Sequence, residues 1–288
     1  MFPGLSYCLP VLLYLTEIPC SIFFDLPNSY QAFLFATVNG NQKRVDRSLA
    51  LEQFGFNVDE EPRESWTPEK IAVYYSRRLN IKDAPFHFHI RVAPRDDQYL
   101  VSTAVKSDWF VSTATVVDGI VDLISKNAKR DRVEMQQQCI FKGRNRKQLS
   151  KIKDDSPLRV LYLKGDAEHD ELIYNIVIDF FEVMKNYVWI HCAPNSFITK
   201  TIGIQASFDF LKRILLKESA TLDSINFTKW VKSFEKVDFS DTYFQQSSSV
   251  GRSRIRNLML IANNLDNEQR IREEDRNKLN QLLHESNL

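Results

Sequence analysis

A short polar turn carries the densest group of ligand-binding side chains in the sequence. Its members are Asn39, Asn41, Gln42, Lys43 and Arg44, and apolar residues precede and follow it. Amide groups can read the edge of a base or a nucleotide, while Lys and Arg hold phosphate groups. The turn is therefore a candidate nucleotide-binding element, with an ordinary polar loop between two helices as the alternative.

A basic stretch at residues 126–153 is the second candidate site. Ten of its residues are Lys or Arg, and only Asp131 and Glu134 oppose them. Such local basic density attracts a polyanion, because each neutralised phosphate of DNA releases a counterion. The stretch is expected either to bind DNA or to be a solvated connector between two halves of the chain. The DNA-binding candidates are Lys142, Arg144, Arg146 and Lys147.

A third candidate is the Ser- and Gly-containing turn at residues 247–256. A turn of this kind that leads into a helix presents free backbone amides to an anion, and Arg252, Arg254 and Arg256 add positive charge. We list these three arginines as further DNA-binding candidates, with a flexible loop and a capped helix as the alternative. The turn lacks the Gly-Lys-Ser/Thr ending of a P-loop, which argues against that kind of nucleotide binding.

Thiol and metal chemistry have little support in the sequence. The cysteines form no Cys-x-x-Cys pair and show no zinc-ligand spacing, so we expect them to be reduced and mostly buried, as is usual in cytosolic proteins. His87 and His89 share one face of a predicted strand without a Cys or carboxylate nearby to complete a metal set. We therefore predict no catalytic residue, no metal site and no cofactor, and leave open whether the protein is an enzyme. The cysteines are Cys8, Cys20, Cys139 and Cys192.

Composition favours a packed, helix-rich globule. Hydrophobic residues make up 43% of the 288 residues, with 20 Phe and 10 Tyr against only 8 Gly, and the formal net charge is +1. The apolar run at residues 8–24 is interrupted by Glu17 and by two prolines. It lacks the features of a signal peptide and is too short and broken to span a bilayer. We expect no membrane association.

The elements that must position these side chains follow from periodicity and capping. A strand is expected at 18–25 and another at 87–92, where apolar and polar residues alternate. The clearest helix is 113–125, in which five Val and Ile residues form one apolar stripe. Thr67 and Pro68 are typical of a helix start. The other expected helices are 30–39, 49–54, 68–80, 170–187, 200–217, 227–237, 255–263 and 267–285.

The polar turn and its neighbours resemble the DGQHR-domain family. Asn39, Gln42 and Lys43 stand at the positions of an Asn-x-x-Gln-Lys hook that ends a helix in that family, and Ser48-Leu49 begin the helix that follows. Further similar segments are 72–80, 84–86 and 195–203, so that the resemblance covers most of residues 18–217. It implies an α+β fold: part of a ParB/sulfiredoxin-like core at 17–110, then a mainly α-helical region at 111–288 packed on it, with a basic connector at 126–153.

The resemblance also implies a function. We expect a cytoplasmic bacterial DNA-associated regulatory or defence protein, similar to the Dnd-type proteins of DNA phosphorothioation systems, with DNA and other proteins of such an operon as partners. The alternative is a nucleotide-binding or nucleotide-hydrolysing enzyme of ParB-like type. A third hypothesis is an inert remnant or a protein-interaction piece.

One departure from the family bears on activity. The sequence contains no Asp-Gly-Gln-His-Arg, and its one Asp-Gly pair, Asp118-Gly119, falls inside the predicted helix 113–125. In the family this signature precedes the strand that corresponds to 18–25. We therefore expect a chain truncated at its N-terminus, with little or no turnover of nucleotide.

Overall fold

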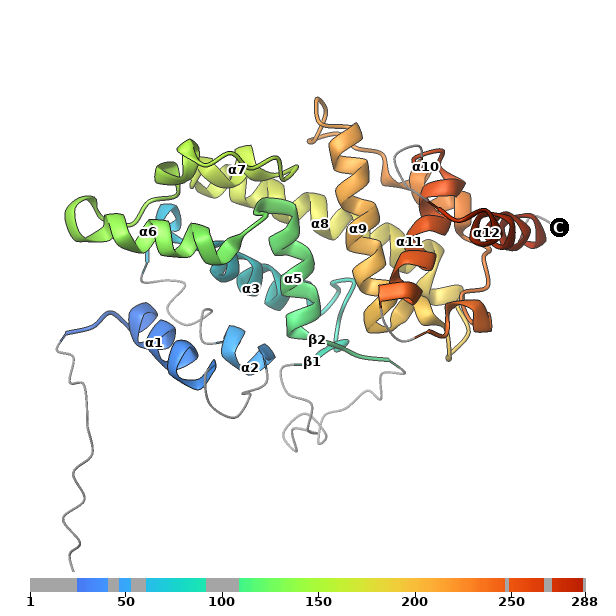
Figure 1. Cartoon of the computed structure of the whole chain (residues 1–288), viewed down its shortest axis with the longest axis horizontal. Coiled ribbons are helices and arrows are strands. Elements are labelled where there is room, and N and C mark those ends of the chain that lie inside the picture. Colours follow the sequence, from blue (N-terminus) through green and yellow to red (C-terminus); the bar gives the residue numbers. More distant parts are fainter. Residues whose placement is uncertain are drawn as a thin grey trace, which may run out of the picture.

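The computed structural model describes residues 25–40, 47–52, 61–91, 109–246, 249–266 and 271–286. In this part of the chain, long helices alternate with short 3-10 turns and one small sheet (Figure 1). The elements are, in order, α1 (Asn28–Gly40), α2 (Arg47–Glu52), η2 (Arg63–Ser65), α3 (Pro68–Leu79), β1 (Ile90–Arg91), β2 (Val111–Ser112), α5 (Thr113–Ile124), α6 (Ala128–Lys142), η3 (Arg146–Lys151), α7 (Arg159–Lys164), α8 (Ala167–Tyr187), η4 (Trp189–His191), η5 (Phe197–Thr199), α9 (Thr201–Lys217), α10 (Phe227–Val231), η6 (Lys232–Phe234), η7 (Thr242–Phe244), α11 (Ser249–Ala262) and α12 (Glu273–Glu285).

Most of the predicted helices are present, and two of them begin at a side-chain cap. Thr67 accepts a hydrogen bond from the backbone N–H of Lys70 and begins α3, and Ser112 caps α5 in the same way through Thr115. The helix predicted at 227–237 is shorter, since α10 gives way to the 3-10 turn η6 after Val231. The helix predicted at 255–263 begins earlier, at Ser249, and the one predicted at 267–285 is described from Glu273.

The sheet of the described residues is much smaller than predicted. Ile90 pairs with Val111 in a parallel ladder of two residues on each strand. The strand predicted at 87–92 is interrupted because Phe88 has φ 60°, which places residues 87–89 in a turn. Asn80 compensates at the edge: its side-chain amide donates to the carbonyl oxygen of Ile90 and accepts from its N–H, both at 3.1 Å. The strand predicted at 18–25 lies outside the described residues, apart from Asp25.

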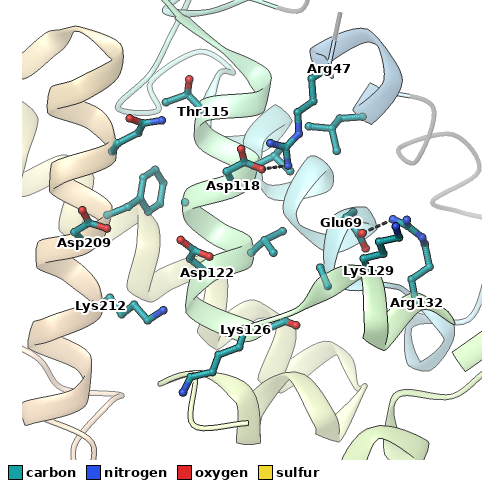
Figure 2. A pocket seen from close by; sticks show the side chains of 18 of the residues that line it. Arg47, Glu69, Thr115, Asp118, Asp122, Lys126, Lys129, Arg132, Asp209 and Lys212 are labelled. Carbon is teal, nitrogen blue, oxygen red and sulfur yellow. Dashed lines mark hydrogen bonds and ion pairs between the residues drawn. The ribbon is translucent and has the colours of Figure 1, made fainter. Parts of the chain in front are cut away.

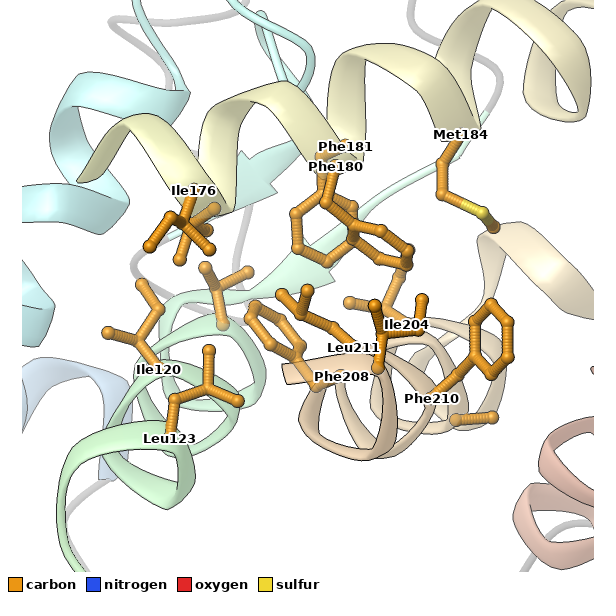
Figure 3. Close-up of a cluster of buried hydrophobic side chains, with 14 of the residues drawn as sticks. Ile120, Leu123, Ile176, Phe180, Phe181, Met184, Ile204, Phe208, Phe210 and Leu211 are labelled. Atoms are coloured by element: carbon orange, nitrogen blue, oxygen red, sulfur yellow. The ribbon is translucent and has the colours of Figure 1, made fainter. Parts of the chain in front are cut away.

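Helix α5 lies at the centre of the fold (Figure 1). It packs against α3 on one side and α9 on the other, and α9 in turn packs against α11. The α5–α9 contact is close at Gly119, where a Cβ atom would lie 2.2 Å from the ring of Phe208. The ring of Phe208 also meets Phe181 of α8 edge to face, with centroids 4.8 Å apart. Figure 3 shows these side chains filling the space between α5, α8 and α9.

The hydrophobic core runs across the boundary predicted at residue 110. Buried side chains from α3, such as Ile71 and Tyr75, belong to the same cluster as Ile120 of α5 and Phe180 of α8. The described residues therefore share one core, and the division into a 17–110 unit and a 111–288 unit stays a prediction. The mainly helical character with a small sheet agrees with an α+β fold at this coarse level.

Residues 126–153 form packed structure, which corrects the expectation of a solvated connector. Most of the stretch is helix α6 and the 3-10 turn η3, and the two pack against each other. Met135 and Leu149 reach the hydrophobic core, while Asp131 is fully buried and accepts hydrogen bonds from Arg159 at 2.5 and 3.2 Å. The basic composition concealed these inward-facing residues, which anchor the stretch to the fold.

Within the described ranges no helix combines the length and hydropathy needed to cross a bilayer.

Candidate functional site

The polar turn predicted to bind a nucleotide falls largely outside the described residues. This holds for Asn41, Gln42, Lys43 and Arg44, while Asn39 lies in the last turn of α1 without a described side chain. The residues that flank the turn are informative. Ala36 of α1 and Arg47 of α2 both line the same groove.

Arg146 is a structural residue, so the prediction that it contacts DNA was wrong. Its side chain is fully buried, and its guanidinium donates to both carboxylate oxygens of Asp170, at 2.6 and 3.1 Å. It also donates to the backbone carbonyl oxygens of Trp66 and Tyr162 at 3.1 and 3.2 Å. The N–H groups of this arginine face the interior of the protein, so a polyanion has no access to them.

Arg144 is also held inside the protein. Its guanidinium donates to Glu61 at 3.0 Å, and Lys70 contacts the same carboxylate at 3.0 Å. Lys147, by contrast, is exposed on η3, whereas Lys142 ends α6 without a described side chain. Of the four cations predicted from this stretch, Lys147 is thus the one whose described side chain is open to solvent.

The arginines at the start of α11 are engaged as well. Arg252 forms a bidentate pair with Asp209 of α9 at 2.5 and 2.7 Å. Arg254 donates to the carbonyl oxygen of Tyr243 and lies 3.4 Å from Asp275, while Arg256 contacts the side chain of its neighbour Asn257. All three are half-buried, which argues against their role as free phosphate contacts and against a flexible loop after Ser249.

Exposed cations nevertheless remain on the basic stretch. Arg130 on α6 and Lys147 and Lys151 on η3 are exposed, as is Lys153, which follows. Among the residues that the structure describes, no carboxylate forms an ion pair with any of these four. These four cations, and Lys129 on α6, which is likewise exposed without such an ion pair, stay available to an external anion.

A groove of about 570 Å³ follows the outer face of α5, and we call it the α5 groove. Figure 2 shows Asp118 and Asp122 projecting from α5, with Asp209 and Lys212 on α9 at one wall and Arg47 of α2 at the other. Small-molecule sites commonly have volumes of roughly 300–1,000 Å³. The remaining wall comes from α3, α6 and α11 and from the link between α5 and α6. Its charged residues are Glu69, Lys126, Lys129, Arg132 and Arg252.

Three ion pairs neutralise most of the charge in the α5 groove. Arg47 contacts Asp118 at 2.6 Å, Arg252 holds Asp209, and Arg132 donates to Glu69. Lys126 turns away to pair with Asp155. The groove charges left without an ion pair among the described residues are Asp122 on the floor and Lys212 and Lys129 on the walls.

The groove changes the acidity of its carboxyl groups. Partial burial raises the pKa of Asp122 above its ordinary value of 3.8, and the nearby ammonium of Lys212 opposes this shift. Burial likewise raises the pKa of Asp118, against the effect of Arg47. Both carboxyl groups therefore gain from any donor or cation that approaches them.

Glu69, which also lines the groove, has one carboxylate oxygen without a hydrogen-bond partner in the described structure. The residue is 8% exposed, and burial raises the pKa of its carboxyl group although Arg132 lies beside it. Arg132 occupies Oε1, while Oε2 has no hydrogen-bond partner within the described structure. A buried carboxylate oxygen without a donor is costly, so the protonated form of this carboxyl group is favoured, in agreement with its raised pKa.

One feature of the sequence could have indicated this groove, although the prediction of helix 113–125 used only its apolar residues. On the predicted helix 113–125, Thr115, Asp118 and Asp122 share the side opposite the apolar stripe. Glu69 and Lys212, which also line the groove, stand far away in the chain, and the packing of α3 and α9 on α5 places them on its walls.

The described cysteine and histidine side chains make packing and hydrogen-bonding contacts. No group of three His, Cys, Asp or Glu side chains is arranged there to hold a metal ion. Cys192 is partly buried, which raises the pKa of its thiol, and its Sγ contacts the carbonyl oxygen of Trp189. His89 stacks on Trp109 with ring centroids 3.8 Å apart. The other three cysteines have no described side chains.

Comparison with protein families, with curated proteins and with solved structures gives no match for this chain. The resemblance to the DGQHR-domain family therefore stays a prediction.

Proposed function

We propose that this protein is a cytoplasmic DNA-associated regulatory or defence protein of the kind found in DGQHR-domain systems. It binds the DNA backbone through the exposed cations of the 126–153 stretch. The observation that carries the proposal is that Arg130, Lys147, Lys151 and Lys153 are exposed and free of ion pairs with described residues. The resemblance of residues 18–217 to that family supports the same function and adds other proteins of a DNA-modification operon as partners.

The way this stretch is anchored supports binding. Arg146 and Asp131 fix η3 and α6 to the core through buried ion pairs, so the exposed cations stand on ordered elements. Ordered cations lose less conformational entropy on binding than those of a mobile connector. Contacts to phosphates of this kind carry no sequence information, and they make affinity strongly dependent on salt.

The experiment compares two variants with the same change in net charge. In the first, Arg130, Lys147, Lys151 and Lys153 are replaced by Glu. In the matched control, the exposed lysines Lys82, Lys217, Lys232 and Lys236, which lie elsewhere on the chain, are replaced by Glu. Binding to a short fluorescent DNA duplex is measured by anisotropy over a range of salt concentrations, and folding is checked by circular dichroism.

Loss of binding in the first variant alone supports the proposal. The slope of log K against log salt should fall by about 0.9 for each phosphate contact removed. Equal loss in both variants would show that only net charge matters, and unchanged binding in the first variant would overturn the proposal.

A further inference from the structure

Three arginines share two neighbouring carboxylates near the start of α8. Arg146 donates to both oxygens of Asp170, and Arg78 donates to both oxygens of Glu171, at 2.6 and 2.7 Å. Arg63 of η2 lies 3.8 Å from the carboxylate of Asp170, and within the described residues its guanidinium donates no hydrogen bond. Both carboxylates are thus engaged by other arginines, and Arg63 adds a positive charge that they do not saturate.

Aromatic rings hold the guanidinium of Arg63 in place. Its Cζ atom lies 5.2 Å from the ring centroid of Trp66 and 5.9 Å from that of Tyr74, which is within the range of cation–π contacts. A ring contact uses the charge of a guanidinium and leaves its N–H groups without a hydrogen-bond acceptor. The side chain of Arg63, 34% exposed, therefore differs from the half-buried Arg252 and Arg254, whose N–H groups donate to protein oxygens.

The element that carries Arg63 adjoins the basic stretch. The turn η2 packs against η3, and η3 packs against α6 and α7. Gly165, between α7 and α8, lies against both turns, since a Cβ atom there would be 3.1 Å from Cα of Glu64 and 3.8 Å from Cδ of Arg146. Arg63 thus stands on a segment next to the one that exposes Lys147.

We propose that Arg63 is a further phosphate-binding residue, which extends the DNA surface from η3 onto η2. The inference rests on the proposed function, because the ligand is the backbone of the same duplex. A guanidinium held by two rings presents its fork of N–H donors to a phosphate with little loss of conformational freedom on binding. Glu64 is exposed and follows Arg63 in the sequence, so it weakens this attraction and offers a second way to test it.

The test measures binding of the full-length chain to a fluorescent DNA duplex by anisotropy at several salt concentrations. Arg63→Gln should reduce the slope of log K against log salt by about 0.9, because one phosphate contact is lost. Arg63→Lys keeps a cation and should restore the slope. If Arg63 served packing alone, lysine could not replace its planar group, and the two variants would behave alike.

Arg256→Gln is the matched control, since it changes the net charge by the same amount. Arg256 lies on α11, toward the other end of the fold from α6 and α7 (Figure 1), and its guanidinium contacts Asn257. Its slope should equal that of the unaltered protein. An unaltered slope in Arg63→Gln, or an equal reduction in Arg256→Gln, would overturn the inference.

A gain of affinity gives a result that misfolding cannot imitate. Glu64→Gln removes the carboxylate next to Arg63 and should strengthen DNA binding about twofold at low salt. Glu273→Gln, in the exposed first turn of α12, is its control and should leave the affinity unaltered. Equal effects of the two substitutions would count against a phosphate at Arg63.

Lys147→Gln, measured alongside, separates this inference from the proposed function. A reduced slope in Lys147→Gln with an unaltered slope in Arg63→Gln would remove Arg63 from the surface and leave DNA binding by the basic stretch in place. Absence of DNA binding by the unaltered protein would overturn both proposals.

Discussion

Arg146 and Asp170 form a buried, two-pronged ion pair that joins the basic stretch to the first turns of the long helix α8. Tyr75 of α3 also donates to the backbone carbonyl oxygen of Asp170 at 2.5 Å, and Arg63 lies 3.8 Å from its carboxylate. Side chains from η2, α3 and η3 thus converge on one residue of α8. Arg146, which was predicted to contact DNA, instead connects η3 to α8 in the interior of the protein.

Replacing Arg146 with Met should destabilise the protein by about 3–5 kcal/mol, because the carboxylate of Asp170 is then left buried without its cation. The free energy of unfolding is measured by urea denaturation. The exposed residue Arg130 provides the control, since Arg130→Met should change stability by no more than about 0.5 kcal/mol. Restoring stability in the double variant Arg146→Met with Asp170→Leu would confirm that the cost comes from the orphaned charge. Equal stability of Arg146→Met and the unaltered protein would contradict the buried pair.

Gly119 should resist substitution although it lies within a helix. Alanine is favoured over glycine in a helix by about 1 kcal/mol, so an exposed helical glycine gains stability from this change. At Gly119, however, the added Cβ would lie 2.2 Å from the ring of Phe208, which is 3% exposed. We expect Gly119→Ala to lower the free energy of unfolding by about 1–3 kcal/mol through overpacking.

The smaller side chain of Phe208→Leu supplies the test of this cause. If the ring is responsible, adding Gly119→Ala to the Phe208→Leu variant should cost less than adding it to the unaltered protein, as read from a double-mutant cycle of urea midpoints. Additive costs would mean that Gly119 is required for another reason.

Local signals predicted the helices well and long-range arrangements poorly. The caps at Thr67 and Ser112 and the apolar stripe of 113–125 act within one or two turns, so they can be read directly from the sequence. The burial of Arg146 depends on Asp170 and Trp66, which come from other segments of the chain. The composition of the basic stretch does not indicate these contacts. For the same reason α6 was mistaken for a connector, because its inward residue Asp131 finds Arg159 only in the folded state.

The α5 groove shows the same limit for the site. The acidic residues Asp118 and Asp122 could have been grouped from their spacing of one helical turn. The presence of Lys212 and Glu69 in the same groove depends on how α3 and α9 pack against α5. A pattern search restricted to neighbouring residues finds half of this groove and misses the other half.

The raised pKa of Asp122 predicts a pH-dependent cost. A carboxyl group whose pKa is higher in the folded than in the unfolded state binds protons more readily when folded, so folding is favoured at low pH and loses this contribution as pH rises through the folded pKa. Asp122→Asn has no such titration. We therefore expect the stability of the unaltered protein, relative to Asp122→Asn, to fall as pH rises from below 3.8 toward neutrality.

Urea denaturation of the two proteins across this pH range measures the effect. Asp179→Glu serves as the comparison, because it keeps a carboxylate on α8 and leaves the groove unaltered. A stability difference between the unaltered protein and Asp122→Asn that stays constant with pH would show that the carboxyl group of Asp122 has its ordinary pKa.

Two basic residues close together in η3 and just before it should differ in their effect on DNA binding. Lys147 is exposed, whereas Arg144 is held by Glu61 at 3.0 Å and is largely buried. Lys147→Gln should weaken binding and lower the slope of log K against log salt by about one, since one phosphate contact is lost. Arg144→Gln should leave the slope unchanged and instead lower the urea midpoint, because Glu61 loses a partner. Anisotropy titrations of both variants at several salt concentrations decide the matter: an equal fall in slope for both would place Arg144 on the DNA surface and contradict the assignment made from the ion pair.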